Sequence, residues 1–521
     1  MGLNTLDLLI IAVYLAGITL FGLRFRKRQR SLRDYFLADR NIPWWAISLS
    51  IVAAETSTLT IISVPGLAYA TNFTFLQLVF GYIVGRVLIA IVLLPHYFRG
   101  DLFTAYELIQ RRFGPKLHSM TAGLFLITRA AAEGVRVFAV AIVVGIALSA
   151  VLGGFNDFGR DLAAITIVTA LTLIYTFEGG LSAVIWTDVV QTATYVGGTL
   201  VGFFTILHSV PGGWSTVSSL AENSGKFRVF DFSWSFFTTY TFWSGVVGGS
   251  FLTLATHGTD QLIVQRLLAA RGLRQSQAAL IASGVFVAVL FTLFLMVGAM
   301  LFAFYHVFPP TISFGKTDRI FPTFIVTQMP HGISGVLIAA ILAAAMSNLS
   351  AALNSLSSSS IVDFYTRFRP QTSEYSRVRL SRIATVFWGL ILFAFAIISR
   401  HGGRVVEVGL SIAGVAFGAL LGVFLLGVLT KRANERGTMV GMLVGFLTSL
   451  YIWEGRGVLQ WLQSATSLHW TVLALPRAIP FTWWFMIGSC ITFAVGYLAS
   501  ILIGVAAGER SNAAVSEQAH T

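Results

Sequence analysis

The stretch ILAAAMSNLSAALNSLSSSS (341–360) is long enough to span a membrane as a helix, and yet it carries many polar side chains. On a helix, one face is shared by Ala344, Ser347, Asn348, Ala351 and Ser355. Hydroxyl and amide groups need partners in hydrocarbon. Two interpretations are open: small residues that let another helix pack closely with interhelical hydrogen bonds, or oxygen donors for a hard cation such as Na⁺.

The composition is that of an all-α polytopic membrane protein. The 521 residues are 56% hydrophobic and 11% charged, whereas soluble proteins carry about 25% charged residues. The mean hydropathy is +0.78, and apolar runs of about 20 residues recur from end to end. A β-barrel would show short alternating segments instead. The single cysteine, Cys490, excludes a disulfide framework and a cysteine-based metal site.

The hydrophobic pattern predicts thirteen spans with alternating connections. They are 5–24, 44–70, 74–97, 117–153, 159–178, 181–207, 236–257, 276–306, 332–363, 380–399, 405–430, 435–453 and 482–507. The connections after spans 1, 3, 7, 9 and 11, with the C-terminal tail, hold most of the Lys and Arg residues, and such connections face the cytoplasm. We therefore expect the N-terminus outside and the C-terminus inside, and we attribute the net charge of +13 to topology rather than to nucleic-acid binding. The first span lacks a basic flank and a cleavage site, so we do not expect a cleaved signal peptide.

Several spans carry ionisable side chains, which are costly in a bilayer and face a cavity or one another. They are Glu55, Arg86, Arg129, Glu133, Arg136 and Asp188, with His257 and Asp260 near the end of the seventh span. Arg129 and Glu133 are four residues apart and can pair. Arg86 can satisfy backbone carbonyls of a broken neighbouring helix, and His257 and Asp260 can cap a helix end. Asp188 has no basic partner within a helical turn, which favours an ion or a hydroxyl cluster from elsewhere.

Two spans are weak helix formers at corresponding positions. The second span contains AAETSTLT (53–60), whose hydroxyls compete for backbone groups, and Pro65 follows. The seventh contains WSGVVGGS (243–250), with three glycines. The second span opens one set of five spans and the seventh opens the next five. Paired interrupted helices are typical of inverted-repeat transporters, in which freed carbonyl oxygens bind cations near the midplane.

The chain resembles the sodium/solute symporter family. The motifs that carry the resemblance are DYFLADRNIPWW (34–45), TAYELIQRRFG (104–114), EGGLSAVIWTDVVQ (178–191), GTDQLIVQRLLAA (258–270) and LAAAMSNLSAALNS (342–355). The resemblance implies a leucine-transporter-type fold with a 5+5 inverted repeat. Its parts would be a peripheral first helix and basic loop (1–43), the first repeat (44–207), an extracellular loop (208–235), the second repeat (236–430), two peripheral helices (431–507) and a short cytoplasmic tail (508–521).

The resemblance also implies sodium sites. The principal site would take backbone carbonyls of Ala53, Thr56 and Ala344 and the side chains of Ser347 and Asn348. The family usually has Ser or Thr at the last of these positions, and asparagine is longer but keeps an amide oxygen. A possible second site would use Asp188 and Ser350. The next position, Ala351, departs from the family pattern because it has no hydroxyl.

The implied solute pocket lies beside the break in the second span, with Ser57, Thr60, Gln77 and Arg136 as candidate contacts. An arginine fork suits a carboxylate, which slightly favours a carboxylate or an acidic sugar. A neutral sugar or polyol stays open, because Glu55 or Glu133 could neutralise the arginines. The implied activity is Na⁺-coupled symport of a small polar solute by alternating access.

Three other functions compete with Na⁺-coupled symport: proton-coupled symport, a transporter-like sensor without coupled transport, and an intramembrane enzyme. The enzyme has little support, because no Walker A, H-E-x-x-H or G-x-S-x-G motif appears and no second catalytic group accompanies Asp188 or His257. We expect a multi-pass protein of the plasma or inner membrane that contacts lipid and a small solute, with no nucleic acid and no obligate protein partner.

Overall fold

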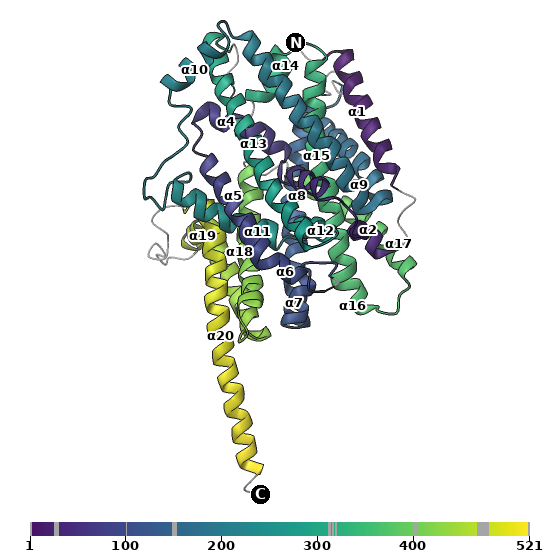
Figure 1. Cartoon of the computed structure of the whole chain (residues 1–521), viewed down its shortest axis with the longest axis vertical. Helices are drawn as coiled ribbons and strands as arrows, with labels where there is room; N and C mark the ends of the chain where they lie inside the picture. The colour runs from purple at the N-terminus through teal and green to yellow at the C-terminus, as the bar shows by residue number, and fades with distance from the viewer. Residues whose placement is uncertain are drawn as a thin grey trace.

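The computed structural model describes residues 3–25, 31–100, 102–147, 154–310, 314, 317, 320–399, 405–465 and 479–518. Within these residues the chain is helical, and the one β-type contact is an isolated bridge between Ile42 and Ala270. The N-terminus and α10 lie at one end of the molecule, while α7, α16 and the C-terminus lie at the other (Figure 1). The predicted all-α class is confirmed for the described part of the chain.

The first half of the chain contains helices that coincide with predicted spans 1 to 6, and four shorter elements, at 32–37, 38–40, 106–112 and 214–223, that lie outside these spans. They are α1 (Thr5–Leu23), α2 (Leu32–Leu37), η2 (Ala38–Arg40), α3 (Trp44–Glu55), α4 (Thr58–Ala70), α5 (Leu76–Leu88), η3 (Ile89–Leu93), α6 (Leu94–Tyr97), α7 (Tyr106–Arg112), α8 (Pro115–Ala147), α9 (Asp157–Ser209) and α10 (Trp214–Asn223). Predicted spans 5 and 6 form the single element α9, which changes direction at Gly180. Glycine fits this position because its φ is +54°, a left-handed value that side chains disfavour.

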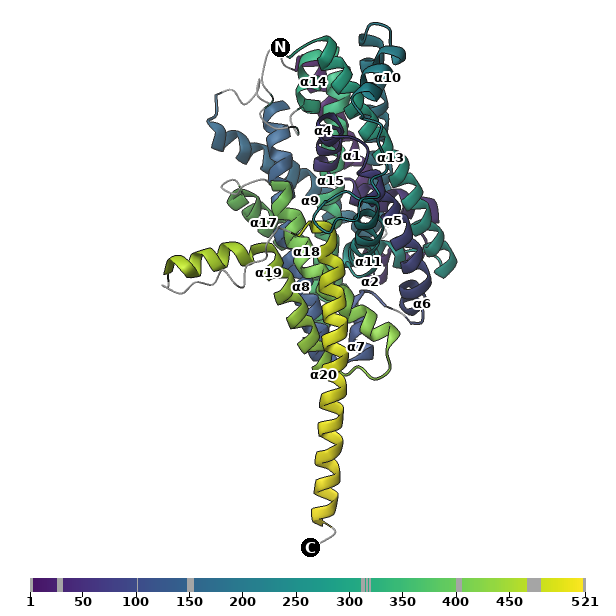
Figure 2. The same ribbon diagram turned by 90° about the vertical axis from the view of Figure 1, so that its left-hand side faces the viewer.

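The second half contains helices that coincide with predicted spans 7 to 13, and three shorter elements, at 261–268, 320–328 and 366–368, that lie outside these spans. They are η4 (Ser244–Gly248), α11 (Gly249–Gly258), α12 (Gln261–Leu268), α13 (Leu273–Val307), α14 (Ile320–Gln328), α15 (Ile333–Ser359), η6 (Ser360–Tyr365), α16 (Thr366–Phe368), α17 (Glu374–Ile398), α18 (Val405–Leu429), α19 (Glu435–Ala465) and α20 (Phe481–Gln518). The last helix, α20, extends away from the bundle toward the C-terminus (Figure 2).

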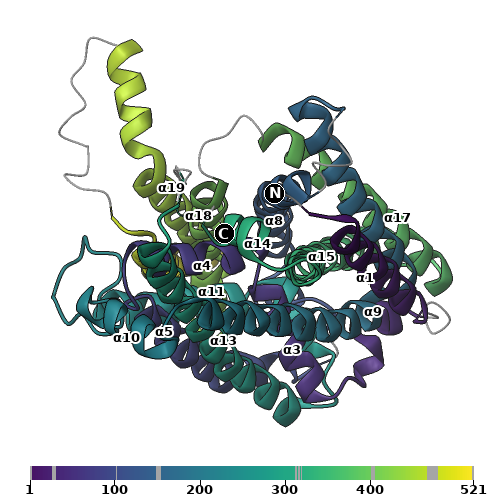
Figure 3. The same ribbon diagram turned by 90° about the horizontal axis from the view of Figure 1, so that it is seen from above.

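Seven described helices are long and apolar enough to cross a membrane, and the bent pair of α3 and α4 makes an eighth candidate. All thirteen predicted spans coincide at least partly with helices, but the exact number of crossings and the orientation of the termini stay predictions. Burial separates the centre of the bundle from its periphery: 94% of the apolar window of α15 is buried, against 28% for α1, α17 and α20. Seen from above, α15 lies among α1, α8, α9 and α14 (Figure 3).

The prediction of a break in the seventh span is wrong. The π-helical η4 runs directly into α11, and both junction residues have right-handed helical dihedrals. The glycines serve close packing instead: a Cβ on Gly245 would lie 2.6 Å from the backbone of Gln77, and one on Gly249 would lie 2.6 Å from the carbonyl oxygen of Leu78. Glycine therefore lets this segment approach α5 rather than unwinding it.

Candidate functional site

The second predicted span is broken, as the sequence predicts. α3 ends at Glu55 and α4 begins at Thr58, and the two helices are bent by 63°. Thr56 has the extended dihedrals φ −82° and ψ 94°, and Ser57 follows as the N-cap of α4. The hydroxyl run explains the break, because Ser57 and Thr60 bond each other's backbone N–H in a capping box. An uninterrupted helix would have given those two N–H groups to the carbonyls of Ala53 and Thr56, which are thereby freed.

The freed carbonyls meet the side chain of Asn348 on α15. Its Nδ2 donates to the carbonyl oxygens of Ala53 at 3.3 Å, Thr56 at 3.1 Å and Ala344 at 3.0 Å. These are the three carbonyls that the family resemblance implies for the principal sodium site, and the structure brings them together at one buried point. Three convergent carbonyl oxygens suit a hard cation, so the backbone here fits Na⁺.

Ser347, the neighbouring candidate ligand, contacts a different group. Its hydroxyl donates to Asp188 Oδ1 at 2.7 Å, and Asp188 Oδ2 accepts from the hydroxyl of Ser50 and from Arg266 Nη2, the latter at 3.1 Å. Arg266 also donates to Ser50 Oγ at 2.8 Å. Asp188, Arg266, Ser50 and Ser347 are all buried. We call these four residues the Asp188 cluster.

The Asp188 cluster contains two residues that sequence reasoning missed, Arg266 and Ser50. The basic partner of Asp188 lies 78 residues further along the chain, on α12, where no local spacing rule could find it. The only signal was the position of Arg266 inside the motif GTDQLIVQRLLAA (258–270). Ser350, predicted for a second sodium site with Asp188, donates its hydroxyl to the carbonyl of Ser347 on its own helix.

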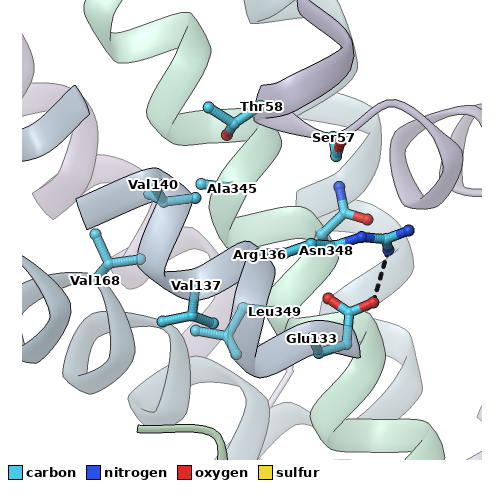
Figure 4. Close-up of a pocket in the computed structure, with 10 residues that line it drawn as sticks. All are labelled: Ser57, Thr58, Glu133, Arg136, Val137, Val140, Val168, Ala345, Asn348 and Leu349. Carbon is cyan, nitrogen blue, oxygen red and sulfur yellow. Dashed lines mark hydrogen bonds and ion pairs between the residues drawn. The ribbon is translucent and has the colours of Figure 1, made fainter. Parts of the chain in front are cut away.

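A small pocket lies between the break, α8 and α15. It is lined by Ser57, Thr58, Glu133, Arg136, Val137, Val140, Val168, Ala345, Asn348 and Leu349. Figure 4 shows that Ser57, Asn348, Arg136 and Glu133 gather on one side and the valines on the other. Arg136 Nη1 donates to Glu133 Oε1 at 2.7 Å. The side chain of Arg136 is 26% exposed while that of Glu133 is 1% exposed, so the guanidinium is the charge that a solute would meet.

Two further solute-contact candidates lie elsewhere in the structure. The hydroxyl of Thr60 pairs with Ser57 in the capping box, and Thr60 is outside the lining given above. Gln77 is fully buried and ties the loop before η4 to α5: its Nε2 donates to the carbonyls of Thr74 and Tyr240, and its Oε1 accepts from Asp231 N. Gln77 therefore lies in a loop-anchoring contact rather than on the pocket wall.

The remaining intramembrane charges form ion pairs. Arg129 Nη1 lies 3.4 Å from Glu133 Oε1, as its spacing predicts, and 3.4 Å from Asp260 Oδ2. Asp260 also caps α12 by accepting from Leu262 N at 2.9 Å, which confirms its predicted capping role. The two arginines on α8, Arg129 and Arg136, are thus matched by the two carboxylates Glu133 and Asp260.

Two interpretations of single residues need correction. Arg86 does not bond backbone carbonyls of the broken helix in the described residues; it pairs with the side chain of Glu55, at the end of α3, and with Ser283. His257 does not cap α11, because its ring contacts Glu55 and Arg86. In both cases the charged carboxylate of Glu55 is a stronger partner than a neutral carbonyl oxygen.

Comparisons with known proteins give one family. The model of the sodium:solute symporter family matches residues 35–445. The sodium/sialic acid symporter NanT of Aliivibrio fischeri is 30% identical over 507 residues, covering 95% of this chain and 93% of that protein. The sodium/sialic acid symporter SiaT of Proteus mirabilis is 32% identical over 450 residues (84% and 87%), and human sodium-coupled monocarboxylate transporter 1 is 27% identical over 434 residues (82% and 69%).

Solved structures give the same architecture. A substrate-bound, outward-open Na⁺-coupled sialic acid symporter superposes with a TM-score of 0.83 at 27% identity, covering 96% of this chain and 98% of that one. The nucleobase-cation-symport-1 family transporter Mhp1 in a closed conformation gives a TM-score of 0.52 at 13% identity, with 90% and 94% covered. The second likeness supports the fold alone.

Proposed function

The chain belongs to the sodium:solute symporter family, and on that premise we propose that it is a Na⁺-coupled symporter of a small organic acid, a carboxylate or an acidic sugar. Na⁺ is the coupling ion of this family. The protein is a multi-pass membrane protein, and we place it in the plasma or inner membrane. The observation that carries the solute class is Arg136, whose partly exposed guanidinium lies in the pocket beside the helix break.

The charges around the pocket support an acidic solute. Glu133 is buried and lies within ion-pair distance of both Arg136 and Arg129, so its negative charge is matched by two guanidinium groups. A guanidinium fork binds a carboxylate with two parallel hydrogen bonds. The relatives named above for sialic acid and monocarboxylates are transporters of carboxylates, which agrees with this assignment. A neutral sugar or polyol is the second candidate, because the Glu133–Arg136 pair at 2.7 Å already neutralises the guanidinium.

The proposed coupling follows from where the donors lie. Ala53 lies in the last turn of α3, Thr56 lies in the break that follows, and Ala344 belongs to α15. Any group that all three carbonyls bind holds the break against α15, and the same break carries Ser57 and Thr58 on the pocket wall. The affinities for ion and solute are therefore linked, each raising the other by the same factor. We propose that alternating access moves both across the membrane.

A thermal-shift screen of the purified protein tests this function. Sialic acid, short monocarboxylates and neutral sugars would each be added in Na⁺ buffer and in K⁺ buffer of equal ionic strength. We expect acids to stabilise the protein more in Na⁺ than in K⁺, and neutral sugars to have no effect. Stabilisation by a neutral sugar instead would favour the second candidate solute, a neutral sugar or polyol. Equal stabilisation by the acids in Na⁺ and in K⁺ would contradict sodium coupling.

A further inference from the structure

The amide of Asn348 stands where three acceptors converge. The carbonyl oxygens of Ala53, Thr56 and Ala344 lie 3.0–3.3 Å from its Nδ2. A carbonyl oxygen can only accept a hydrogen bond, so the atom facing them must be the NH₂ group and not Oδ1. The identity of the terminal atoms is thus fixed by the chemistry of the surroundings.

This amide is an incomplete partner for its neighbours. An NH₂ group carries two hydrogens, so three carbonyls have to share them. The oxygen of the same amide lacks a partner altogether: Asn348 Oδ1 is buried and has no hydrogen bond among the described residues. A buried acceptor without a partner costs free energy that pairing it would recover. The Nδ2 end of the Asn348 amide is therefore hydrogen-bonded, whereas its Oδ1 end is not.

The position of Nδ2 is also the position that an ion would need. A cation in contact with all three oxygens has to lie between them, and the NH₂ group, within hydrogen-bond distance of each, fills that space. The carbonyls come from the break and from α15, so the amide holds these two elements together as a bound ion would. Ser347, the other side-chain ligand that the family resemblance implies, donates its hydroxyl to Asp188.

We propose that Asn348 is an internal competitor for the coupling ion: its amide NH₂ substitutes for Na⁺ at the three carbonyls and has to leave before the ion binds. The inference rests on the proposed Na⁺-coupled function and adds what sets the ion affinity of this chain. Departure of the amide frees the carbonyls and allows Oδ1, the unpaired oxygen, to become a ligand of the ion. A shorter hydroxyl side chain at this position cannot reach all three carbonyls, so it would not compete.

The test is Na⁺ binding by the purified protein, measured without transport. We would titrate Na⁺ against K⁺ at constant ionic strength and follow thermal unfolding and binding of radioactive ²²Na⁺ in wild type, Asn348→Ser and Asn348→Thr. The matched control is Asn354→Ser: Asn354 lies on the same helix, is also buried, and its Oδ1 accepts from Gln265 at 3.4 Å, away from the carbonyl cluster.

We expect half-saturation at a Na⁺ concentration about tenfold lower in Asn348→Ser than in wild type, which corresponds to about 1.4 kcal/mol. Asn348→Thr, a second hydroxyl variant in case the serine protein does not fold, should shift in the same direction, and Asn354→Ser should titrate like wild type. In K⁺ alone, Asn348→Ser should melt below wild type, because the carbonyls have lost their internal donor. Addition of Na⁺ should reduce this difference in melting temperature, because the ion replaces the lost donor.

Equal Na⁺ titrations in wild type and the hydroxyl variants would overturn the inference, as would weaker binding in the variants or an equal shift in Asn354→Ser. Absence of a Na⁺ response in every protein would also overturn it, because removal of the amide would then have opened no site. Uptake assays separate this inference from the proposed function: uptake that needs Na⁺ with no effect of Asn348→Ser leaves the symporter standing without the competitor. Tighter Na⁺ binding in Asn348→Ser, together with uptake that does not depend on Na⁺, would support Asn348 as a competitor and contradict Na⁺-coupled symport.

Discussion

The Asp188 cluster makes a quantitative prediction about stability. Arg266→Met keeps most of the side-chain volume but removes the guanidinium that lies 3.1 Å from Asp188 Oδ2 and bonds Ser50 and the carbonyl of Leu262. Arg266 is 1% exposed and Asp188 is fully buried, so the substitution leaves an uncompensated buried carboxylate. Breaking such a pair costs about 3–5 kcal/mol. We expect the lower end, about 3 kcal/mol, because the hydroxyls of Ser50 and Ser347 still donate to Asp188.

A double-mutant cycle measures how much of that cost is the stranded charge. Asp188→Asn removes the carboxylate charge while keeping the side chain's size, so the pair Arg266→Met/Asp188→Asn should be destabilised by about 2 kcal/mol less than the sum of the single changes. The assay is denaturant unfolding of the protein in detergent micelles, in Na⁺-free buffer, followed by tryptophan fluorescence. Arg228→Met is the control: Arg228 is exposed and its partner Asp231 is partly exposed (57% and 23%), so this pair should contribute about 1 kcal/mol or less.

A loss of stability in Arg266→Met no larger than that in Arg228→Met would contradict a buried ion pair in the Asp188 cluster. Additive losses for Arg266→Met and Asp188→Asn would contradict it as well, since residues in one ion pair have to be coupled.

Three further predictions concern the pocket, helix packing and pH. Arg136→Lys should weaken solute binding about tenfold while leaving the melting temperature in the absence of solute unchanged, because lysine keeps the charge but not the planar fork; equal solute titrations would exclude a bidentate contact. Gly298→Ala should destabilise the protein by about 1–3 kcal/mol, because its Cβ would lie 2.2 Å from the carbonyl oxygen of Pro65, whereas Gly17→Ala, with no atom within 4 Å, should be neutral in the same unfolding assay. Burial raises the pKa of Glu107, in the connection between α6 and α8, to about 7. Its contribution to stability is therefore present below its unfolded pKa and lost as the pH rises through about 7, so unfolding at pH 5 to 8 should show a decline of at most about 1.4 kcal/mol per pH unit that Glu107→Gln abolishes.

The sequence predicted the break in the second span because its cause is local. Hydroxyls at Ser57 and Thr60 bond the backbone N–H groups that would otherwise continue the helix, and this competition is visible in the order of the residues. The glycines of the seventh span misled for the opposite reason. Gly245 and Gly249 have no side chain because α5 packs directly against them. Close helix packing and an unwound segment both favour glycine, so the sequence alone does not distinguish these two causes.

Long-range partners could not be predicted from spacing. Asp188 pairs with Arg266 on α12, and Glu55 pairs with Arg86 and His257. The partners are far apart in the sequence, so only the tertiary structure shows that they meet. The candidate sodium carbonyls were reached through the family resemblance, and the structure brings them together. That Asn348 fills the point between them depends on the length of one side chain and on its rotamer, which no pattern in the sequence records.

Uptake into proteoliposomes tests the central claim most directly. The purified protein, reconstituted alone, would be given a radiolabelled carboxylate from the thermal-shift screen, with Na⁺ outside and K⁺ inside. Na⁺-coupled symport predicts transient accumulation above equilibrium, which disappears when a sodium ionophore dissipates the gradient or when choline replaces Na⁺. Equal uptake in choline, or accumulation driven by a proton gradient without Na⁺, would contradict it.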